Sequence, residues 1–387
     1  EPGQRQRPSS VRIRCAPSYP MNDRLGVPET GMLAHRTLPA LMAPAQLLPG
    51  RSQDVDALLA WGRRPSARRV ERLAQRRGLP VWHLEDGLLR SLAKGRRHPP
   101  LCLLVDDLGV HFDATAPSRL EQRIAASLSA EQRDRARVVQ LLWCTQRLSK
   151  LNPPRESPAP EQRFVLVVDQ SAGDLSISLG LAGPQSFQQM LRAALADHPD
   201  CTVVVKVHPD VIQGRARGHF SPDALQHPRI RLCADGGHPA ALLERAEALY
   251  VVTSQMGFEA LLWGRPVHCF GMPFYAGWGL TQDRLRPPER RTARPGLEAL
   301  VHAALIAGSR CLDPHSLQPA PIEDLMRAIG LQRRLQSQPA ARLEAFGFTP
   351  WKQRNLRRFL AGSTLRFRLP RARPGRRAEA VAVWGRR

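Results

Sequence analysis

The chain has 387 residues, of which 57 are lysine or arginine and 34 are aspartate or glutamate, so its formal net charge is +23. Such an excess of positive charge predicts an anionic partner: nucleic acid, an acidic membrane surface or an acidic saccharide. The seven cysteines form no C-x-x-C pair and no apolar run approaches the roughly 18 residues of a membrane-spanning helix, which argues against a disulfide scaffold, a zinc site and a transmembrane segment.

The first part of the chain, residues 21–151, is predicted to form one α/β unit. Residues 1–20 precede it and are rich in arginine and proline without the apolar stretch of a secretory signal, so we expect a disordered or extraneous segment. Within the unit, the apolar run ALLAW predicts a strand, and a basic helix is expected over 66–78. The next strand, LPVWHL, runs into Glu85-Asp86-Gly87.

Further elements are expected before residue 151. The segment PPLCLLVDDLGVHFDAT predicts a strand, a turn and a second strand. Its Asp106 and Asp107 resemble a metal-binding pair, although the turn that follows favours a solvated β-turn. Two helices are then expected within 118–150, where Ser129 and Gln132 have the spacing of a capping box.

A proline-rich linker over 152–162 separates this unit from a second one, residues 163–315. The second unit starts with a buried strand, Phe164–Val168, and a loop that carries Asp169 and Asp174. Ser186 and Gln189 have capping-box spacing, which predicts that a helix opens there and ends near Ala196.

A strand within CTVVVKVHPD follows and brings Lys206 and His208 to its carboxyl end. Further on, a strand near 230–233 and a helix near 239–246 are expected.

The stretch from 249 to 271 predicts a strand, a helix and another strand. Its apolar run Leu249–Val252 is followed by Ser254 in the position of a helix N-cap, and Gly264 and Pro266 end the helix. A helix N-terminus that follows a strand offers unpaired N–H groups and a favourable dipole to a phosphate. Glu259, one turn further in, could reach a sugar hydroxyl of the same ligand, and an ordinary βαβ unit with a capping serine is the alternative.

The alternation of strands and helices indicates a parallel sheet with both faces covered. Ligands of such sheets bind beyond the carboxyl ends of the strands. The loop of Asp174, the loop of His208 and the turn at Ser254 all lie at such ends. We therefore expect these three segments to meet.

The end of the chain contains a repeat. VWGRR at 383–387 matches AWGRR at 60–64, and residues 347–360 loosely match residues 31–42 in the same order. This pattern predicts closing helices over 316–344 and the truncated start of a second module over 345–387. An incomplete module cannot complete its fold, so we expect it to be loosely held.

Six ordered motifs between about residue 31 and residue 315 together resemble the KpsC (LipA) family of capsule-polysaccharide proteins, which are Kdo transferases. The motifs that carry the resemblance are WGRRPS at 61–66, LEDGLLRS at 84–91, VDDLG at 105–109 with Asp113-Ala114, Asp169-Gln170 with Gly173-Asp174, KVHPD at 206–210, and most of 250–281. Members usually carry two tandem modules, and the DQSAGD form is similar to the N-terminal module.

The resemblance implies an α/β fold of the GT-B type, with two Rossmann-like domains and a cleft between them. It implies a retaining transfer of Kdo from CMP-β-Kdo onto a β-Kdo-terminated linker on a phosphatidylglycerol-type lipid, with no metal and no cofactor beyond the nucleotide-sugar donor. In this family the N-terminal domain serves the acceptor and the second domain binds CMP-Kdo. The implied partners are the anionic inner-membrane surface and the capsule export machinery, and the implied location is cytoplasmic and peripheral to the inner membrane.

Retention through two inversions needs a carboxylate nucleophile and a second group for proton transfer. The resemblance assigns the nucleophile to Asp174, for which helix capping is the alternative from the local sequence. Glu85 from the other half is the predicted acid/base, with Asp86 or a structural turn as the competing interpretation.

The donor is expected to be bound by residues after three strands, with a cation or N–H donor offsetting charge on the departing phosphate. Tyr275 and Trp278 could stack on the cytosine or the sugar, although filling the core is the more common role for such aromatics. The predicted donor-binding residues are Lys206, His208, Ser254, Gln255, Glu259 and Gly271.

Two other classes of function compete with an enzyme. A nucleic-acid-binding protein would suit the charge, but the sequence lacks the interleaved aromatics, zinc spacing and recognition helix of such proteins, so nucleic acid is not expected. A catalytically inactive peripheral membrane protein is the other alternative, and the intact carboxylates and the His-Pro pair argue against it.

Overall fold

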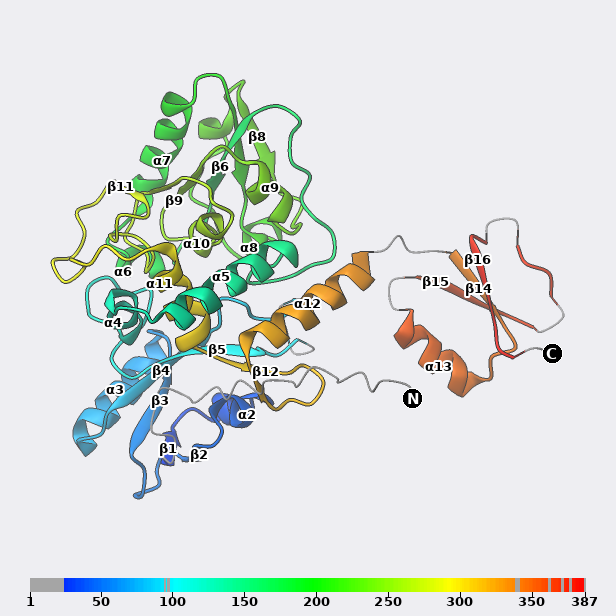
Figure 1. Ribbon diagram of the computed structural model, residues 1–387, viewed down its shortest axis with the longest axis horizontal. Coiled ribbons are helices and arrows are strands. Elements are labelled where there is room, and N and C mark those ends of the chain that lie inside the picture. The colour runs from blue at the N-terminus through cyan, green and yellow to red at the C-terminus, as the bar shows by residue number, and fades with distance from the viewer. Residues whose placement is uncertain are drawn as a thin grey trace, which may run out of the picture.

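The computed structural model describes residues 24–93, 95, 98–337, 342–360, 363–369, 372–375 and 378–385. The predicted segment 1–20 lies outside these ranges. The described residues form three sheets: a mixed seven-stranded sheet, a parallel six-stranded sheet and a small three-stranded sheet (Figure 1). No helix in the described ranges combines the length and the apolar character needed to cross a membrane.

The seven-stranded sheet has the order β13-β12-β5-β4-β3-β1-β2. The elements of its N-terminal part are β1 (Arg24–Val27), α1 (Thr30–Leu33), α2 (Leu38–Met42), β2 (Gln46–Pro49), β3 (Ala57–Trp61), α3 (Pro65–Arg77), β4 (Val81–Asp86) and β5 (Cys102–Asp106). Helices α1 and α2 cover one face and α3 covers the other, so each face of the sheet has its own apolar cluster. Helix α3 begins at Pro65 and ends at Gly78, whose φ of 64° suits glycine.

The six-stranded sheet has the order β11-β10-β9-β6-β7-β8, and neighbouring strands in it pair in parallel. Its elements are β6 (Phe164–Val168), α6 (Leu175–Leu179), α7 (Pro184–Asp197), β7 (Thr202–Lys206), α8 (Pro209–Ile212), the 3-10 helix η1 (Asp223–Leu225), β8 (Ile230–Cys233), α9 (Ala240–Arg245), β9 (Leu249–Val251), α10 (Gln255–Leu262), β10 (Val267–Cys269) and β11 (Gln282–Asp283).

Strand β6 shows why this sheet is buried on both faces. Its Val165 and Val167 pack in the cluster that contains Phe187 of α7, whereas Leu166 packs in the cluster that contains residues of α9 and α10. Successive side chains of a strand point to opposite faces, so a run of five apolar residues requires helices on both sides. The predicted parallel sheet with both faces covered is confirmed for this half.

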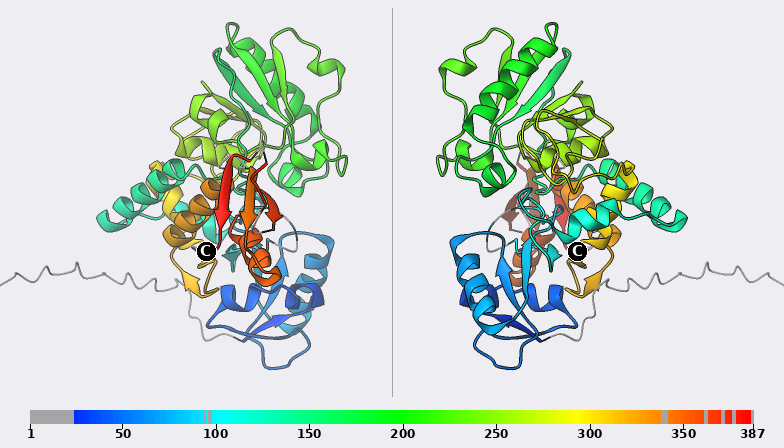
Figure 2. Two further views of the ribbon diagram at one scale, coloured as in Figure 1. Left: turned by 90° about the vertical axis from the view of Figure 1, so that its right-hand side faces the viewer. Right: turned by 90° about the vertical axis from the view of Figure 1, so that its left-hand side faces the viewer.

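Several helices lie between the seven-stranded and the six-stranded sheets and share one apolar core with both. They are α4 (Arg119–Ala125), α5 (Ala130–Thr145), α11 (Leu297–Val301), the π-helix η2 (His302–Ala307) and α12 (Ile322–Ser337). Figure 2 shows the seven-stranded and the six-stranded sheets at opposite ends of the molecule with α5 and α12 between them. Leu89 of the first half, Trp143 of α5 and Phe258 of α10 belong to the same buried cluster, which packs the halves together. Helix α5 starts with the predicted capping box of Ser129 and Gln132.

The first half differs from a simple parallel unit. Strand β5 runs antiparallel to β4, because the connection over 87–101 has no helix among its described residues to carry the chain back for a parallel pairing. Strands β12 (Ser309–Leu312) and β13 (Pro319–Ala320) then extend this same sheet. The predicted boundary at 315 is therefore wrong, and the described residues of 316–344 contain one helix together with strands.

Two local predictions are also wrong. No second strand follows β5 over 108–115, because the carboxylate of Asp106 accepts hydrogen bonds from the N–H groups of Leu108 and Gly109 and folds the chain into a turn. The predicted helix to about Ala196 is confirmed by α7, which ends at Asp197, but its predicted start is wrong. The helix begins at Pro184, and Ser186 lies inside its first turn, where the hydroxyl accepts from the N–H of Gly183.

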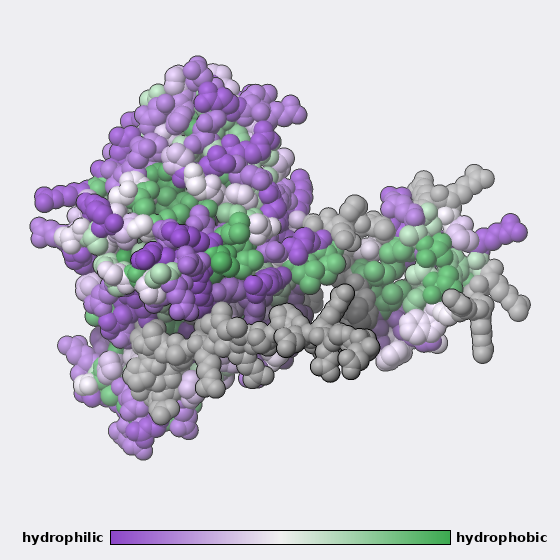
Figure 3. All heavy atoms as spheres, in the orientation of Figure 1, coloured by the Kyte–Doolittle hydropathy of each residue, from purple (hydrophilic) through white to green (hydrophobic). Residues whose placement is uncertain are grey.

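The small sheet contains β14 (Arg342–Phe346), β15 (Thr364–Arg368) and β16 (Ala380–Val383), with α13 (Pro350–Phe359) after its first strand. Its order β15-β14-β16 repeats the order β2-β1-β3, and all pairings in both groups are parallel. The registers agree as well: Leu25 pairs with Leu47 and Ala57, and Leu343 pairs with Leu365 and Ala380. The unit lies beyond the end of α12, beside the main body (Figure 1 and Figure 3).

Candidate functional site

The loops after β6, β7 and β9 meet at the carboxyl edge of the six-stranded sheet. These strands are adjacent in the order β9-β6-β7, so their ends are neighbours although they are distant in sequence. Gln170 joins two of the loops, because its Oε1 accepts from the N–H of Thr253 and its Nε2 donates to Thr253 Oγ1, both at 3.0 Å. Ser171 Oγ lies 3.1 Å from Nδ1 of His208 and joins the third loop. The predicted convergence of the three loops is confirmed.

Asp174 is exposed at the start of α6, where its Oδ1 accepts from the N–H of Ser176 at 2.9 Å. The side chain therefore caps this helix and also faces solvent. Asp169, the other aspartate of the loop, is buried and accepts from the N–H groups of Gln170 and His219. Burial raises the pKa of Asp169. Of the two aspartates, only Asp174 is placed where a ligand can reach it.

His208 is half-buried in the loop after β7, beside the loop after β6. Its Nδ1 accepts from the N–H of Asp210 at 3.1 Å, so in the neutral ring the proton lies on Nε2. An Nε2–H group is a hydrogen-bond donor that suits a phosphate oxygen. Asp210 Oδ1 accepts in turn from Arg215 NH2 at 2.9 Å.

Lys206 does not join this site. Its side chain is 8% exposed, and Nζ donates to Ser157 Oγ at 3.1 Å and to the carbonyl of Gly237 at 3.2 Å. Ser157 belongs to the linker between the halves, and it also donates to Asp235. The structure therefore gives Lys206 a role in holding the linker instead of the predicted contact with a phosphate.

Ser254 is the N-cap of α10 as predicted, and its Oγ accepts from the N–H of Met256. Its carbonyl accepts a hydrogen bond from Tyr275 Oη. Gly271 packs against the end of β9, where a Cβ atom would lie 2.8 Å from Thr253 Cγ2 and 2.9 Å from the carbonyl oxygen of Val252. A side chain at 271 would therefore push the following loop away from the site.

Gln255 and Glu259 point to the seam between the halves. Gln255 Nε2 donates to the carbonyl of Leu88 at 2.7 Å and to Glu259 Oε1 at 3.0 Å. Glu259 is 1% exposed and also accepts from the N–H of Lys150. Among the described residues its Oε2 has no hydrogen-bond partner, and burial raises its pKa to about 7, although the side chain of Ser149 opposes the shift. This placement contradicts the predicted contact of Glu259 with a sugar hydroxyl, since a carboxyl held in the core does not face the three loops.

Glu85 lies at the end of β4, against the turn after β3. A Cβ atom at Gly62, whose φ is +59°, would lie 2.2 Å from Glu85 Oε1, so glycine leaves the space that the carboxyl occupies. Burial raises the pKa of Glu85 to about 7, although the positive charge of Lys150 opposes the shift. Asp86, the alternative acid/base, accepts from Arg90 Nε at 2.9 Å. The ion pair commits Asp86 to Arg90, whereas Glu85 lines a small cavity together with His83 and His111.

The aromatics of the loop after β10 fill the core. Tyr275 is fully buried and Trp278 is 1% exposed, and the indole N–H of Trp278 donates to the carbonyl of Phe274. The core role that competed with stacking on a ligand is therefore the one that the structure shows. Asp106 is likewise structural, because it accepts from four backbone N–H groups, those of Leu108, Gly109, Arg119 and Leu120.

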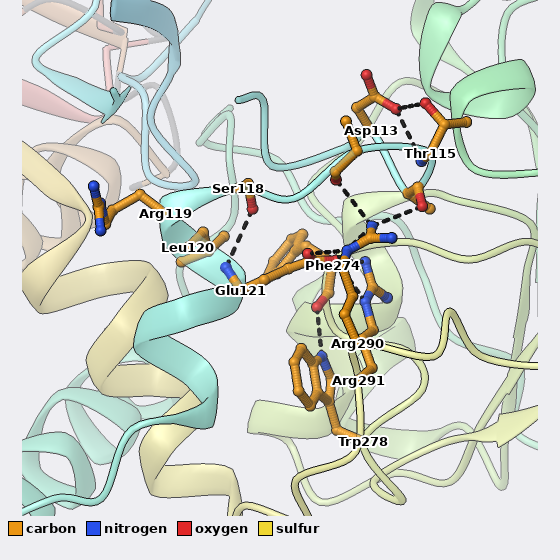
Figure 4. Close-up of polar contacts among 12 residues, drawn as sticks. Asp113, Thr115, Ser118, Arg119, Leu120, Glu121, Phe274, Trp278, Arg290 and Arg291 are labelled. Carbon is orange, nitrogen blue, oxygen red and sulfur yellow. Dashed lines mark hydrogen bonds and ion pairs between the residues drawn. The ribbon is translucent and has the colours of Figure 1, made fainter. Parts of the chain in front are cut away.

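Sequence reasoning missed the contacts that hold these loops. Glu121 of α4 pairs with both Arg290 and Arg291, and Figure 4 shows the two guanidinium groups beside its carboxylate. The signal was the adjacent arginine pair in the segment RPPERRTARP, but a local sequence cannot reveal an acidic partner some 170 residues earlier. The contacts of Gln170 and Ser171 were missed for a similar reason, since their partners lie in loops after other strands.

The parallel sheet gathers a carboxylate, an imidazole and a helix N-terminus at its carboxyl edge, next to a second α/β half. This is the edge at which α/β proteins bind their ligands, and a helix N-terminus there favours an anion. In the part of the chain that the structure describes, no three histidine, cysteine, aspartate or glutamate side chains are grouped as metal ligands.

The model of the family described as capsule polysaccharide biosynthesis protein matches residues 56–152 and 135–310. The chain belongs to this family, the KpsC/LipA family of capsule polysaccharide proteins. It is 36% identical over 319 residues to the capsule polysaccharide modification protein LipA of Neisseria meningitidis serogroup B, a match that covers 78% of this chain and 45% of LipA. The lipopolysaccharide-processing protein LpsZ of Rhizobium meliloti is 34% identical over 286 residues, covering 72% of this chain and 64% of LpsZ. The chain thus spans about half the length of the LipA relatives that it matches.

Two solved structures are similar over the same region. The β-Kdo 2,4 transferase of Thermosulfurimonas dismutans KpsC has a TM-score of 0.74 at 36% identity, covering 80% of this chain and 98% of that one. The β-Kdo 2,7 transferase of the same KpsC has a TM-score of 0.62 at 25% identity, covering 80% and 99%.

Proposed function

We propose that this chain is a retaining β-Kdo glycosyltransferase of the GT-B type that moves Kdo from CMP-β-Kdo onto a β-Kdo-terminated lipid linker in capsular polysaccharide biosynthesis. The convergence of Asp174, His208 and the N-terminus of α10 carries the proposal, because it offers a nucleophile and two phosphate-binding groups at one sheet edge. The similarity to the β-Kdo 2,4 transferase of KpsC supports the sugar and favours the same linkage.

In the first proposed step, an Asp174 oxygen bonds to the anomeric carbon of Kdo while the bond from that carbon to the phosphate oxygen breaks, and CMP leaves with the electron pair. The imidazole N–H of His208 and the N–H groups at the start of α10 offset the charge that develops on this phosphate. The contact between Asp174 Oδ1 and the N–H of Ser176 fixes the orientation of the nucleophile.

In the second step, the acceptor hydroxyl attacks the same carbon from the opposite side, the bond to Asp174 breaks, and the hydroxyl proton moves to Glu85. Two inversions leave the anomeric configuration unchanged. Glu85 suits this role because a carboxyl with a pKa of about 7 both accepts and returns a proton near neutral pH.

The test is Kdo transfer by the purified chain, with CMP-Kdo generated in situ and a β-Kdo-terminated acceptor, and with the linkage read by NMR. Asp174→Ala should abolish transfer, because no other group in the proposal can form the covalent intermediate. The control is Asp223→Ala, at an exposed aspartate of the same half. Full activity of Asp174→Ala, or no transfer by the wild-type chain, would remove the proposal.

We also propose that residues 342–385 are the first strands of a second module. The support is the repeated strand order and register, in which Leu343 takes the place of Leu25.

A further inference from the structure

One carboxylate joins the two halves next to the candidate site. Glu121 is 5% exposed, and its Oε1 accepts from Arg291 Nε at 2.7 Å while its Oε2 accepts from Arg290 Nε at 2.7 Å. Helix α4 brings Glu121 from the first half, whereas the arginines follow the last strand of the six-stranded sheet. Figure 4 shows the arginines side by side, with Arg290 toward the loop of Asp113 and Thr115.

Arg291 extends from this carboxylate to the loop after β10. Its NH1 donates to the carbonyls of Pro273 at 2.8 Å and Ala276 at 2.7 Å, on either side of Tyr275. Tyr275 in turn donates to the carbonyl of Ser254, the N-cap of α10. One series of contacts therefore runs from Glu121 to the helix N-terminus proposed for the donor phosphate.

Arg290 extends to the loop over 113–116. Its NH2 donates to the carbonyls of Ala114 at 2.7 Å and Ala116 at 2.9 Å. The N–H of Ala114 donates to the carbonyl of Leu179 at 2.8 Å, and Leu179 ends the helix that Asp174 caps. A second series of contacts therefore runs from Glu121 to the helix of the proposed nucleophile.

The same loop also reaches the other half of the site. Asp113 Oδ2 lies 3.3 Å from Arg63 NH2, and Arg63 directly follows Gly62, the residue against which Glu85 packs. The loop over 113–116 is thus bonded on one side to the turn that holds Glu85 and on the other to the helix that begins after Asp174. Arg290 adds two hydrogen bonds to the carbonyls of this loop.

We infer that Glu121 and Arg290 are positioning residues for the transfer reaction, which act by fixing the loop over 113–116 between the supports of Glu85 and Asp174. The inference rests on the proposed function for its chemistry, but not for its geometry. Neither residue belongs to the three loops that would touch the donor. Loss of Arg290 should move the nucleophile relative to the bound donor, and a displacement of about 1 Å can cost roughly 100-fold in rate.

Arg290→Gln tests the inference better than a change of Glu121 does. The side chain of Arg290 is 32% exposed, so its loss leaves no buried gap, and Arg291 stays paired with Glu121. We expect turnover to fall roughly 10- to 100-fold while the affinity for CMP, measured by calorimetry, stays within about twofold because the series of contacts through Arg291 is intact. Glu121→Gln, which weakens both series, should lower turnover and CMP affinity together. The control is Arg137→Gln, which breaks exposed ion pairs with Asp134 and Glu298 and should change neither quantity.

Hydrogen exchange gives a readout that does not depend on activity. In Arg290→Gln the peptide over 175–179 should exchange faster than in the wild type, and the peptide over 255–262 should not. Unchanged exchange over 175–179, or equal losses of turnover and CMP affinity in Arg290→Gln, would overturn the inference. If the wild-type chain transfers no Kdo, the proposed function fails, and the exchange measurement still decides whether Arg290 positions α6.

Discussion

Glu85 and Asp86 are adjacent carboxylates with different surroundings in the structure. Asp86 is paired with Arg90, whereas Glu85 is packed against Gly62 and its pKa is raised by burial. The contact with the Arg90 guanidinium occupies one oxygen of the Asp86 carboxylate and holds the side chain in place. A desolvated carboxyl with a pKa near the working pH is a good proton carrier. The pattern EDG alone left both residues possible, and their surroundings favour Glu85.

This difference makes a prediction for the pH dependence of transfer. As the base of the second step Glu85 must be deprotonated, so kcat/KM should rise with pH through about 7, the pKa to which burial raises this group. Glu85→Gln should lower kcat/KM by about 100-fold or more and remove this rise. Asp86→Asn serves as the comparison, since it should weaken the contact with Arg90 but keep the pH profile. A profile that loses its rise in Asp86→Asn and keeps it in Glu85→Gln would reverse the assignment.

Glu259 predicts a pH dependence of stability. Burial raises its pKa to about 7 from the ordinary glutamate value of 4.5, so between these values the folded state binds more protons than the unfolded state. The free energy of unfolding should therefore fall as pH rises through this window, by about 1–3 kcal/mol from this group, and level off above it.

The measurement is chemical denaturation of the wild type and of Glu259→Gln at pH 5 and pH 8. Glutamine keeps a carbonyl for the N–H of Lys150 and does not ionise, so the variant should lose less stability than the wild type between the two pH values. Equal losses would show that Glu259 ionises freely in the folded protein.

The three-stranded unit of β14, β15 and β16 packs differently from its counterpart, the strands β1, β2 and β3. In the first half, β3 pairs with β1 on one side and with β4 on the other. Its counterpart β16 pairs with β14, and Val383 and Trp384 at its end are 59% and 56% exposed. The buried residues Ala345 and Phe346 belong to none of the four core clusters of the main body. The unit is therefore expected to unfold on its own.

A chain that ends after Ser337 tests this expectation. Because the removed strands share no core cluster with the rest, the main thermal transition should shift by no more than a few degrees, measured by circular dichroism. Transfer activity should be retained, since the candidate site lies in residues before α12. A large loss of stability in the shortened chain would mean that the unit supports the main body.

Over the whole molecule, the net charge of +23 is uneven. In the sequence, residues 342–387 include many arginines and only two acidic residues, Glu344 and Glu379. Long-range attraction to an anionic surface depends on this total charge and is screened by salt.

We therefore predict binding of the chain to anionic lipid. In a flotation assay, the fraction bound to liposomes should increase with the content of phosphatidylglycerol and decrease with ionic strength, because each basic residue near the surface contributes about 1 kcal/mol. Liposomes of neutral phosphatidylcholine are the control. Binding that ignores both lipid charge and salt would exclude an electrostatic attachment to the membrane.

The local elements and the meeting point of the three loops followed from the sequence, because apolar runs, caps and turn residues act over a few positions. Ser254 at its cap and the all-parallel sheet around β6 are examples. The resemblance of six ordered motifs gave the family.

What each polar side chain contacts was decided only in the tertiary structure. Lys206 and Glu259 were placed wrongly because burial and the linker, not the neighbouring sequence, set their partners. The antiparallel β5, the return of β12 to the first sheet and the pairing of Glu121 with Arg290 and Arg291 depend on contacts between distant segments, which no local pattern encodes.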